Sequence, residues 1–300
     1  MPAASQSLPK TPVLHCVVCD ADSLPSEVQT AKVRSNIRKF SQETFALWQC
    51  KKCGSIHAAD EVDLDYYYAH YPFHDQKMNT LTRLAYKGKL RELEKLGLKR
   101  EHRVLDYGCG GGVFVQLLQQ EGYSLARGYD PYAKEGPYRE PPGTGYDVVL
   151  SQDVIEHVAS PREHLETLKS LTVPGALLFI GTPNAEVVDL DTPGEFIHML
   201  HQPYHLHILT AATIGKLAAP LGMEVVKVKY GFYGNRAFPG INGRFLRRIL
   251  RTQGDVLDDM VAGIMPKSLA LYSPAAIWDA LTGAWRDPGH DMTVALRRQA

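Results

Sequence analysis

A glycine-rich loop after an apolar strand holds the first residues whose types and spacing could do chemistry. In "RVLDYGCGGGVF" (103–114), Asp106 stands two positions before Gly108, and Gly110 completes a G-x-G pattern. Such loops, placed between a strand and a helix, bring backbone amides close to a bound nucleotide. The third glycine of the dinucleotide fingerprint would fall at Val113, so glycine spacing alone leaves the kind of nucleotide open.

Two carboxylates around this loop distinguish between nucleotides. Asp106 lies at the mouth of the loop, where its charge would repel a pyrophosphate and attract an ammonium group. Asp130 ends the next expected strand and is placed to accept both hydroxyls of a ribose. S-adenosylmethionine has a ribose and an ammonium but no phosphate, so the two side chains suit it better than NAD. The alternative interpretation of Asp106 is a residue that only forms a turn at the strand end.

Four cysteines near the N-terminus form two C-x2-C pairs, which is the ligand spacing of a zinc ribbon. Asp20 and Gly54 follow the two pairs and are of the types that let such a knuckle turn tightly. Four thiolates would leave no open coordination position, so we expect a structural zinc whose loss unfolds the module. The alternatives are a chance pairing and a redox pair. The expected ligands are Cys16, Cys19, Cys50 and Cys53.

Histidines gather in "EFIHMLHQPYHLHI" (195–208) and could take a proton from the hydroxyl group of an acceptor. His205 and His207 alternate, so an extended chain would put both on one face, and we rank them first as general bases. His157 in "DVIEHV" is the further candidate. The alternatives are histidines that cap turns or pack, and a metal site, which ranks lower because only Glu195 stands at an obvious ligand spacing.

Alternating strands and helices would position these residues. We expect strands at 103–106, 124–131, 146–151, 175–181, 223–233 and 291–298, and helices at 81–96, 113–120, 160–171 and 210–222. Ser160 is a good N-cap, with Pro161 at the first helical position and Glu163 to complete a capping box. The pattern predicts an α/β, Rossmann-like, doubly wound sheet that binds ligands beyond the carboxyl ends of its strands.

Four stretches in this order resemble the motifs of class I S-adenosylmethionine-dependent methyltransferases: "VLDYGCGGG", "GYDP", "YDVVLSQDVIEHV" and "GALLFIGTPN". The resemblance runs from about residue 100 to 230 and resumes at the last strand. "DVIEHV" is similar to the branch that contains the ubiquinone-biosynthesis O-methyltransferases, and a ribbon before such a domain resembles enzymes that methylate sugars and natural products. The resemblance implies a seven-stranded type of sheet.

The resemblance also implies site residues. Cofactor contacts would come from Tyr107, Gly108, Gly110, Asp130, Gln152 and Asp153. Only fourteen residues separate "GYDP" from "YDVV", which is too short for the usual helix and strand. Pro131 and Tyr132 would therefore take over the adenine contacts.

Two further segments, outside these motifs, contain residues that could contact a ligand. "DEVDLDYYYAHYPFHDQ" (60–76) is either an aromatic plug that packs the ribbon onto the main domain or a lid, with Tyr71 and His74 nearest the cofactor. Residues 235–288 form an insertion before the last strand. In it, Arg244, Arg247, Arg248 and Arg251 share one helical face. We favour a solvated basic stripe; the alternatives are a grip on an anionic handle such as a phosphate, and a homodimer helix.

Bulk composition limits the functional classes. The 300 residues hold 33 Lys and Arg against 33 Asp and Glu, so no global field would collect nucleic acid. No run reaches transmembrane length, and the N-terminus lacks an apolar signal core, so we expect a cytoplasmic protein. We predict a ribbon (12–58), an aromatic linker and helix (59–100), and a methyltransferase domain (101–300).

The sequence favours transfer of a methyl group to oxygen on a small-molecule, sugar or natural-product acceptor. The alternatives are methylation at a sugar carbon, an rRNA methyltransferase, and a protein that binds the cofactor without catalysis.

Overall fold

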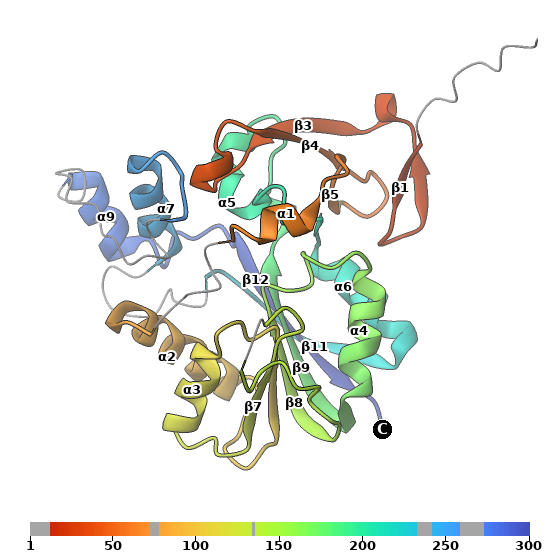
Figure 1. The fold of residues 1–300 in the computed structure, drawn as a ribbon, viewed down its shortest axis with the longest axis vertical. Helices are drawn as coiled ribbons and strands as arrows, with labels where there is room; N and C mark the ends of the chain where they lie inside the picture. Colours follow the sequence, from red (N-terminus) through yellow and green to blue (C-terminus); the bar gives the residue numbers. More distant parts are fainter. Residues whose placement is uncertain (1–12, 72–77, 134–135, 233–241, 259–272) are drawn as a thin grey trace, which may run out of the picture.

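A computed structural model describes residues 13–71, 78–133, 136–232, 242–258 and 273–300 of the chain. Its centre is a mixed sheet whose six described strands have the order β11-β12-β9-β8-β6-β7 (Figure 1). The neighbours β9, β8, β6 and β7 are parallel, and β12 runs antiparallel to both of its neighbours, β9 and β11. The strands are β6 (Val104–Tyr107), β7 (Ala126–Tyr129), β8 (Tyr146–Gln152), β9 (Thr172–Pro183), β11 (Met223–Tyr230) and β12 (Asp291–Arg298).

Helices cover both faces of this sheet because its strands are apolar on both sides. Alternate residues of β6 show the division, since Val104 packs with α2 (Thr80–Lys95) and α3 (Val113–Gln120), whereas Leu105 packs with α4 (Pro161–Ser170) and α6 (Ala211–Ala218). Strands buried on both faces are typical of parallel sheets. The doubly wound α/β prediction is confirmed.

Local signals in the sequence fix where the helices begin and end. The Ser160 hydroxyl accepts from the Glu163 amide at 3.2 Å, which gives half of the expected capping box, and Pro161 is the first residue of α4. Gly97 and Gly122 follow α2 and α3 with positive φ. The short segment after β7 contains no helix or strand in its described residues, as expected from its length.

The N-terminal module is built on two cysteine knuckles. Both knuckles turn through left-handed residues, Asp20 (φ 55°) and Gly54 (φ 75°), and their amides donate to the carbonyls of Cys16 and Cys50 at 2.8 Å. Its strands are β1 (Leu14–Cys16), β2 (Ala21–Ser23), β3 (Gln29–Arg34), β4 (Thr44–Gln49) and β5 (Ile56–Ala58). A strand from the main domain, β10 (His207–Ile208), extends this small sheet by pairing with β5.

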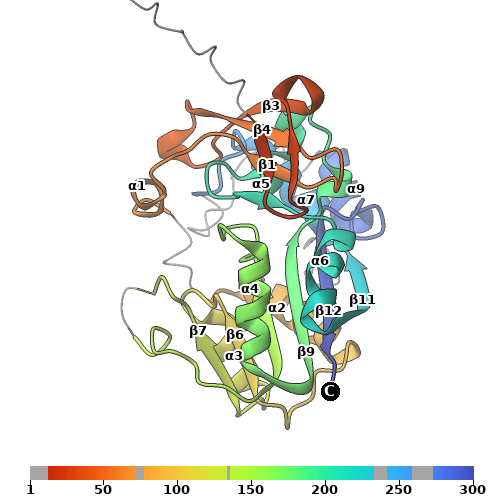
Figure 2. The same ribbon diagram turned by 90° about the vertical axis from the view of Figure 1, so that its right-hand side faces the viewer.

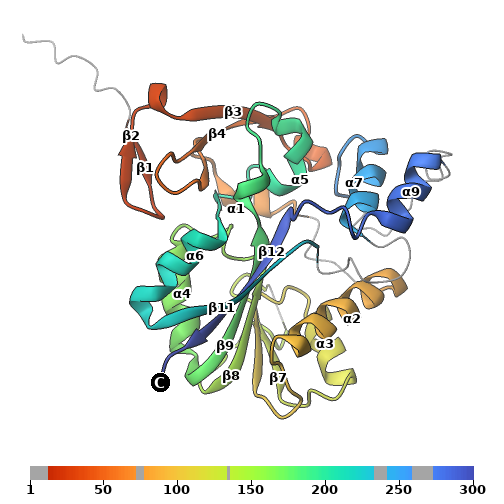
Figure 3. The same cartoon turned by 180° about the vertical axis from the view of Figure 1, so that it is seen from behind.

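The module lies beyond the carboxyl ends of the parallel strands, where the ligand site is expected (Figures 1 and 2). Three further helices lie at the same end of the molecule (Figure 3). They are α5 (Ile197–Leu200), α7 (Gly243–Thr252) and α9 (Pro274–Thr282). The remaining short elements are α1 (Leu64–Tyr68), η1 (Pro25–Glu27), η2 (Arg38–Phe40), η4 (Ala185–Val187), η5 (Pro193–Phe196) and η6 (Ala219–Leu221). Within the described ranges, none of the helices has the length and apolar character needed to cross a bilayer.

Gly128 of β7 provides a test of this packing. A Cβ atom there would lie 2.7 Å from the Cys109 sulfur and 2.8 Å from the Tyr138 ring. We expect Gly128→Ala to lower the free energy of unfolding by about 1–3 kcal/mol, because the neighbours must move apart. Gly194→Ala, with open space around the added methyl group, is the matched control. Equal urea midpoints for the two variants would contradict the close approach.

Candidate functional site

The loop between β6 and α3 needs glycine for steric reasons. Gly108 has a φ of 79°, and a Cβ atom there would lie 2.3 Å from a methyl carbon of Val154. Its amide donates to the Tyr129 carbonyl at 2.7 Å, which ties the loop to β7. Gly112, with a φ of 71°, begins α3. The loop therefore lies flat across the carboxyl ends of β6 and β7.

Asp130 is fixed at the edge of this loop by two backbone amides. Its carboxylate oxygens accept from Gly110 and from Tyr132, each at 2.8 Å. A carboxylate has about four lone-pair positions, so it keeps acceptor capacity for two hydroxyl groups. Tyr132 is 71% exposed, and its ring lies parallel to that of Tyr68 with the centroids 6.0 Å apart. Pro131, the other residue expected to contact adenine, is also exposed.

Asp106 is buried at the end of β6, and a buried lysine of α2 faces it. Burial raises the pKa of Asp106 to about 6, while the Lys89 ammonium acts in the opposite direction. Burial lowers the pKa of Lys89, and the charges of Asp106 and Asp153 oppose that change. Lys89 also lies over the Phe114 ring at 4.5 Å. The sequence analysis missed Lys89, although it stands at an apolar position of the helix pattern, four residues before Leu93.

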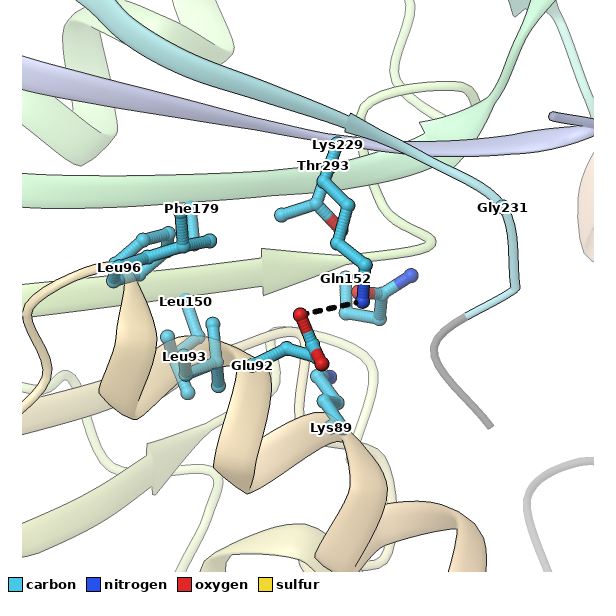
Figure 4. Close-up of a pocket in the computed structure, with 10 residues that line it drawn as sticks. All are labelled: Lys89, Glu92, Leu93, Leu96, Leu150, Gln152, Phe179, Lys229, Gly231 and Thr293. Atoms are coloured by element: carbon cyan, nitrogen blue, oxygen red, sulfur yellow. Dashed lines mark ion pairs between the residues drawn. The ribbon is translucent and has the colours of Figure 1, made fainter. Parts of the chain in front are cut away.

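Gln152 and Asp153 follow at the end of β8, as the motifs suggested. Gln152 lines a small cavity between the sheet and α2, together with Lys89 (Figure 4). Lys229 and Glu92, which form an ion pair at 2.9 Å, also line this cavity. Asp153 has a φ of 55°, a conformation that strains residues other than glycine, and such strain is common at functional sites.

A second cluster, which we call the Glu–His cluster, consists of Glu156, His157 and His205. The rings of the two histidines have centroids 4.7 Å apart, and His205 Nε2 lies 4.0 Å from Glu156 Oε1. Thr182 donates to the other oxygen of Glu156 at 2.9 Å, while Oε1 has no hydrogen-bond partner among the described residues. Glu156 is fully buried, which raises the pKa of its carboxyl well above the usual value.

Backbone carbonyls fix the protonation of both rings in the Glu–His cluster. His205 Nδ1 lies 2.7 Å from the Met199 carbonyl, and His157 Nδ1 lies 3.0 Å from the Tyr204 carbonyl. A carbonyl only accepts, so each Nδ1 must carry the proton and each Nε2 presents a lone pair. Burial lowers the pKa of His157 to about 4 and that of His205 well below 6.5. Both rings are therefore neutral at pH 7.

The same three side chains could also hold a cation. One ligand atom from each lies within 4.8 Å of the others, and a carboxylate with two imidazoles is a common donor set for divalent metals. From the sequence, Glu195 was the carboxylate considered for a metal site, and Glu156 was only the neighbour of the candidate base His157. The adjacency of Glu156 and His157 in "DVIEHV" was the available signal.

The structure separates His207 from His205, so the expectation of a shared face is wrong. The chain turns at residues 202–204 and is not extended at His205. His207 Nδ1 lies 3.0 Å from His57 Nδ1, and its Nε2 lies 3.2 Å from the Ala159 carbonyl. His207 therefore lies beside the cysteine module rather than in the Glu–His cluster.

The aromatic segment packs directly on the Glu–His cluster. The Tyr68 hydroxyl lies 3.0 Å from His157 Nδ1, and the Tyr71 ring lies 4.7 Å from that of Tyr204 and 5.8 Å from that of His201. This places Tyr71 on the side of the histidines. The described part of the segment thus packs against the main domain, as a plug would. It does so at the place where a lid was expected. His74 lies outside the described residues.

The four paired cysteines converge as their spacing predicts. Cys16 and Cys53 have sulfurs 3.6 Å apart, and Cys19 and Cys50 have sulfurs 3.7 Å apart. Sulfurs bound to one tetrahedral zinc at 2.3 Å lie about 3.8 Å apart, so the donor set fits this metal. His57 Nε2 lies 3.2 Å from the Cys16 sulfur, a neighbour that the sequence analysis missed.

Comparison with known proteins agrees with this geometry. A family model described as "Methyltransferase domain" matches residues 75–228. The ubiquinone biosynthesis O-methyltransferase of Caulobacter sp. (strain K31) is 33% identical over 104 residues, which cover 27% of this chain and 41% of that protein. That of Dinoroseobacter shibae is 28% identical over 171 residues, covering 50% and 63%. The chain thus spans less than two thirds of either relative.

Solved structures of methyltransferases are also similar. A putative sarcosine dimethylglycine methyltransferase from Galdieria sulphuraria aligns at 11% identity with a TM-score of 0.45, over 79% of this chain and 97% of that one. Coclaurine N-methyltransferase bound to N-methylheliamine and SAH aligns at 15% identity with a TM-score of 0.43, over 75% and 76%. The family model covers half of the sequence, including the glycine loop and the Glu–His cluster, and so the chain belongs to the methyltransferase domain family.

Proposed function

We propose that the chain transfers a methyl group from S-adenosylmethionine to a hydroxyl oxygen of a small-molecule, sugar or natural-product acceptor. The observation that carries the proposal is the position of two groups at one end of the sheet. The glycine loop with its carboxylates lies over β6 and β7, and the Glu–His cluster follows β8. A cofactor site and a proton acceptor are thereby brought to the same edge.

Charge supports S-adenosylmethionine over a dinucleotide. Asp106, Asp130 and Asp153 outnumber Lys89, so the loop region favours a cation and disfavours a pyrophosphate. Asp130 would hold the ribose with its remaining lone pairs, and the backbone at Tyr107, Gly108 and Gly110 would line the same side. The cofactor, when bound, supplies an electrophilic methyl group on a positively charged sulfur.

The acceptor hydroxyl must lose its proton when its oxygen attacks the methyl carbon. We assign that proton to Nε2 of His205, with His157 as the second candidate, because this nitrogen has a free lone pair and a neutral ring. Glu156 lies 4.0 Å from the same nitrogen and would stabilise the imidazolium that forms. Tyr71 and Tyr204 would exclude water from the acceptor.

Transfer of label from methyl-labelled S-adenosylmethionine tests the proposed reaction directly. The protein would be incubated with an extract of its source cells, fractionated into small molecules, glycans and lipids, RNA, and protein. We expect label in the small-molecule or glycan fraction. Label confined to RNA or protein would refute the acceptor class, and mass spectrometry of the labelled product would show whether oxygen or carbon was methylated.

Asp106 tests the cofactor assignment. Asp106→Asn keeps the shape of the side chain but removes the charge proposed to face the ammonium. We expect the affinity for S-adenosylmethionine, measured by calorimetry, to fall about tenfold or more, since hydrogen bonds between charged groups are of that strength. Asp147→Asn, at the opposite end of β8, is the control and should bind normally. Equal affinities of wild type and Asp106→Asn for S-adenosylmethionine would contradict a contact between Asp106 and the cofactor.

His205 tests the assignment of the base. We expect His205→Asn to lower kcat by about 10²- to 10⁴-fold while the affinity for the cofactor stays the same, because a positioned base contributes that much. His102→Asn, just before the amino end of β6, is the matched control. An unchanged kcat for His205→Asn, together with a loss in His157→Asn, would move the base to His157. Rescue by added divalent metal would favour a metal site instead.

We also propose that the four paired cysteines hold one structural zinc ion. The sulfur separations and the two tight knuckles support it. The metal would fix β1, β2 and the turn before β5, and it would have no open position for catalysis.

Loss of zinc should therefore unfold the module. We expect one zinc per chain by elemental analysis, and a lower melting temperature together with a changed far-ultraviolet spectrum after chelation. Cys53→Ser should lose the metal. Cys109→Ser, in the glycine loop, is the matched control and should keep it. A chelated protein with an unaltered spectrum and melting curve would contradict the structural role.

A further inference from the structure

In the arginine stripe of α7, Arg244, Arg247 and Arg248 are partly buried and Arg251 is exposed. Arg244, Arg247, Arg248 and Arg251 line one pocket of about 700 Å³, including space open to solvent, which lies between α7, η5 and α9. Phe196 and His290 complete its wall. The sequence analysis favoured a solvated stripe; Arg244, Arg247 and Arg248 are only partly exposed and have carboxylate partners from other segments. Figure 3 shows α7 next to α9, at the same end of the molecule as α5.

We call this the arginine pocket. Its guanidinium groups outnumber the carboxylates that form ion pairs with them. The nearly buried Asp279 is shared by Arg244, Arg248 and Arg286, with N–O separations of 3.5, 2.6 and 2.6 Å. Arg251 pairs with Glu195, and Arg247 lies 3.6 Å from Asp287. Five guanidinium groups thus share three carboxylates among the ion pairs of the described residues, and the carboxyl of Asp291 also lies near Arg247.

Two of the guanidinium groups keep N–H donors without acceptors. Arg244 Nε and Arg247 Nη2 are shielded from solvent and have no hydrogen-bond partner in the described part of the chain. Their nearest carboxylates lie at 3.5 and 3.6 Å, beyond good hydrogen-bond length. Burial lowers the pKa of Arg247, and the charges of Asp287 and Asp291 oppose that change. An anion that accepts hydrogen bonds from both guanidinium groups would remove the free-energy cost of burying these unpaired donors.

The arginine pocket adjoins the proposed methyl-transfer site. Asp291, the first residue of β12, follows His290 of the pocket wall and pairs with Pro183, next to Thr182, whose hydroxyl donates to Glu156. Burial and the charge of Asp153 together raise its pKa to about 7, against the opposing charge of Arg247. Asp291 in turn raises the pKa of Glu156 in the Glu–His cluster. On the other side, Phe196 of the pocket wall leads directly into α5 and then His201.

We propose that the arginine pocket binds the phosphate or diphosphate group of the acceptor, while the acceptor's hydroxyl reaches the Glu–His cluster. This inference rests on the proposed methyl transfer and narrows its substrate to a phosphate ester. Guanidinium groups match phosphate oxygens in geometry as well as charge, and a diphosphate would offer acceptor oxygens to several of them. The Phe196 ring offers a flat apolar surface for a sugar or base next to the phosphate.

Calorimetry on the full-length, zinc-loaded chain tests the inference, with sodium pyrophosphate and inorganic phosphate as probes. We expect wild type to bind pyrophosphate, and the double variant R247Q/R248Q to bind it at least about tenfold more weakly. Arg251→Gln, at the exposed rim, is a milder variant that spares Asp279 and should weaken binding about threefold. Arg297→Gln, exposed at the far end of β12, is the matched control and should bind as wild type does.

The relative affinities for pyrophosphate and inorganic phosphate distinguish a diphosphate ester from a monophosphate ester as the ligand. Much tighter binding of pyrophosphate than of phosphate points to a diphosphate ester, and equal binding to a monophosphate; both support the pocket. No binding by wild type, or equal binding by all variants, overturns it. An oligonucleotide that binds through these arginines and is not displaced by pyrophosphate also overturns it, in favour of nucleic acid.

The affinity of the same variants for S-adenosylmethionine keeps the two proposals distinguishable. Normal cofactor binding without pyrophosphate binding would refute only the arginine pocket. Pyrophosphate binding in a chain that does not bind the cofactor would refute the proposed methyl transfer while leaving an anion site.

Discussion

The pairing of β10 with β5 is the interaction on which the arrangement of the site depends. His207 and Ile208 pair with His57 and Ile56 of the cysteine module. On the other side of the same stretch, the amides of Leu206 and His207 donate to the Glu156 carbonyl at 2.8 and 3.2 Å. The backbone just after His205 is therefore held from two directions. In the proposed reaction the module would form a wall of the acceptor side, and its metal would help to set the position of His205 in the main domain.

Electrostatics divides the carboxyl edge of the sheet into two regions of opposite sign. Three aspartates against one lysine make the region around the glycine loop negative, and guanidinium groups outnumber carboxylates among the described ion pairs of the arginine pocket. The Glu–His cluster lies between them and is kept neutral by burial. A cationic methyl donor and an anionic acceptor would each be attracted to one side. In the proposed reaction they meet over the neutral groups.

Features that depend on a few adjacent residues could be predicted from the sequence. Contacts between side chains from distant parts of the chain could not. The glycine loop, the cap at Ser160 and the cysteine knuckles each lie within a few adjacent residues, and the structure contains them. Glu156 and His205 are far apart in the chain, and their meeting depends on the turn at 202–204, which periodicity does not reveal. The arginine stripe was visible on its helix. Its partners Asp279 and Asp287 come from a distant segment, so the pocket was not visible.

Burial gives Glu156 and His205 the protonation states that a methyl transfer requires. It raises the pKa of the carboxyl and lowers that of the imidazole, so burial disfavours the charged form of both groups. A charged imidazolium at rest would have no lone pair for the acceptor's proton and would repel the sulfonium. In the proposed reaction, the positive charge lost from the sulfur reappears on His205, so the total charge of the closed site stays constant. Glu156, whose Oε1 lies 4.0 Å from the same nitrogen, would then lie beside the new cation. A buried, neutral acid–base pair is thus consistent with catalysis in a site of low polarity.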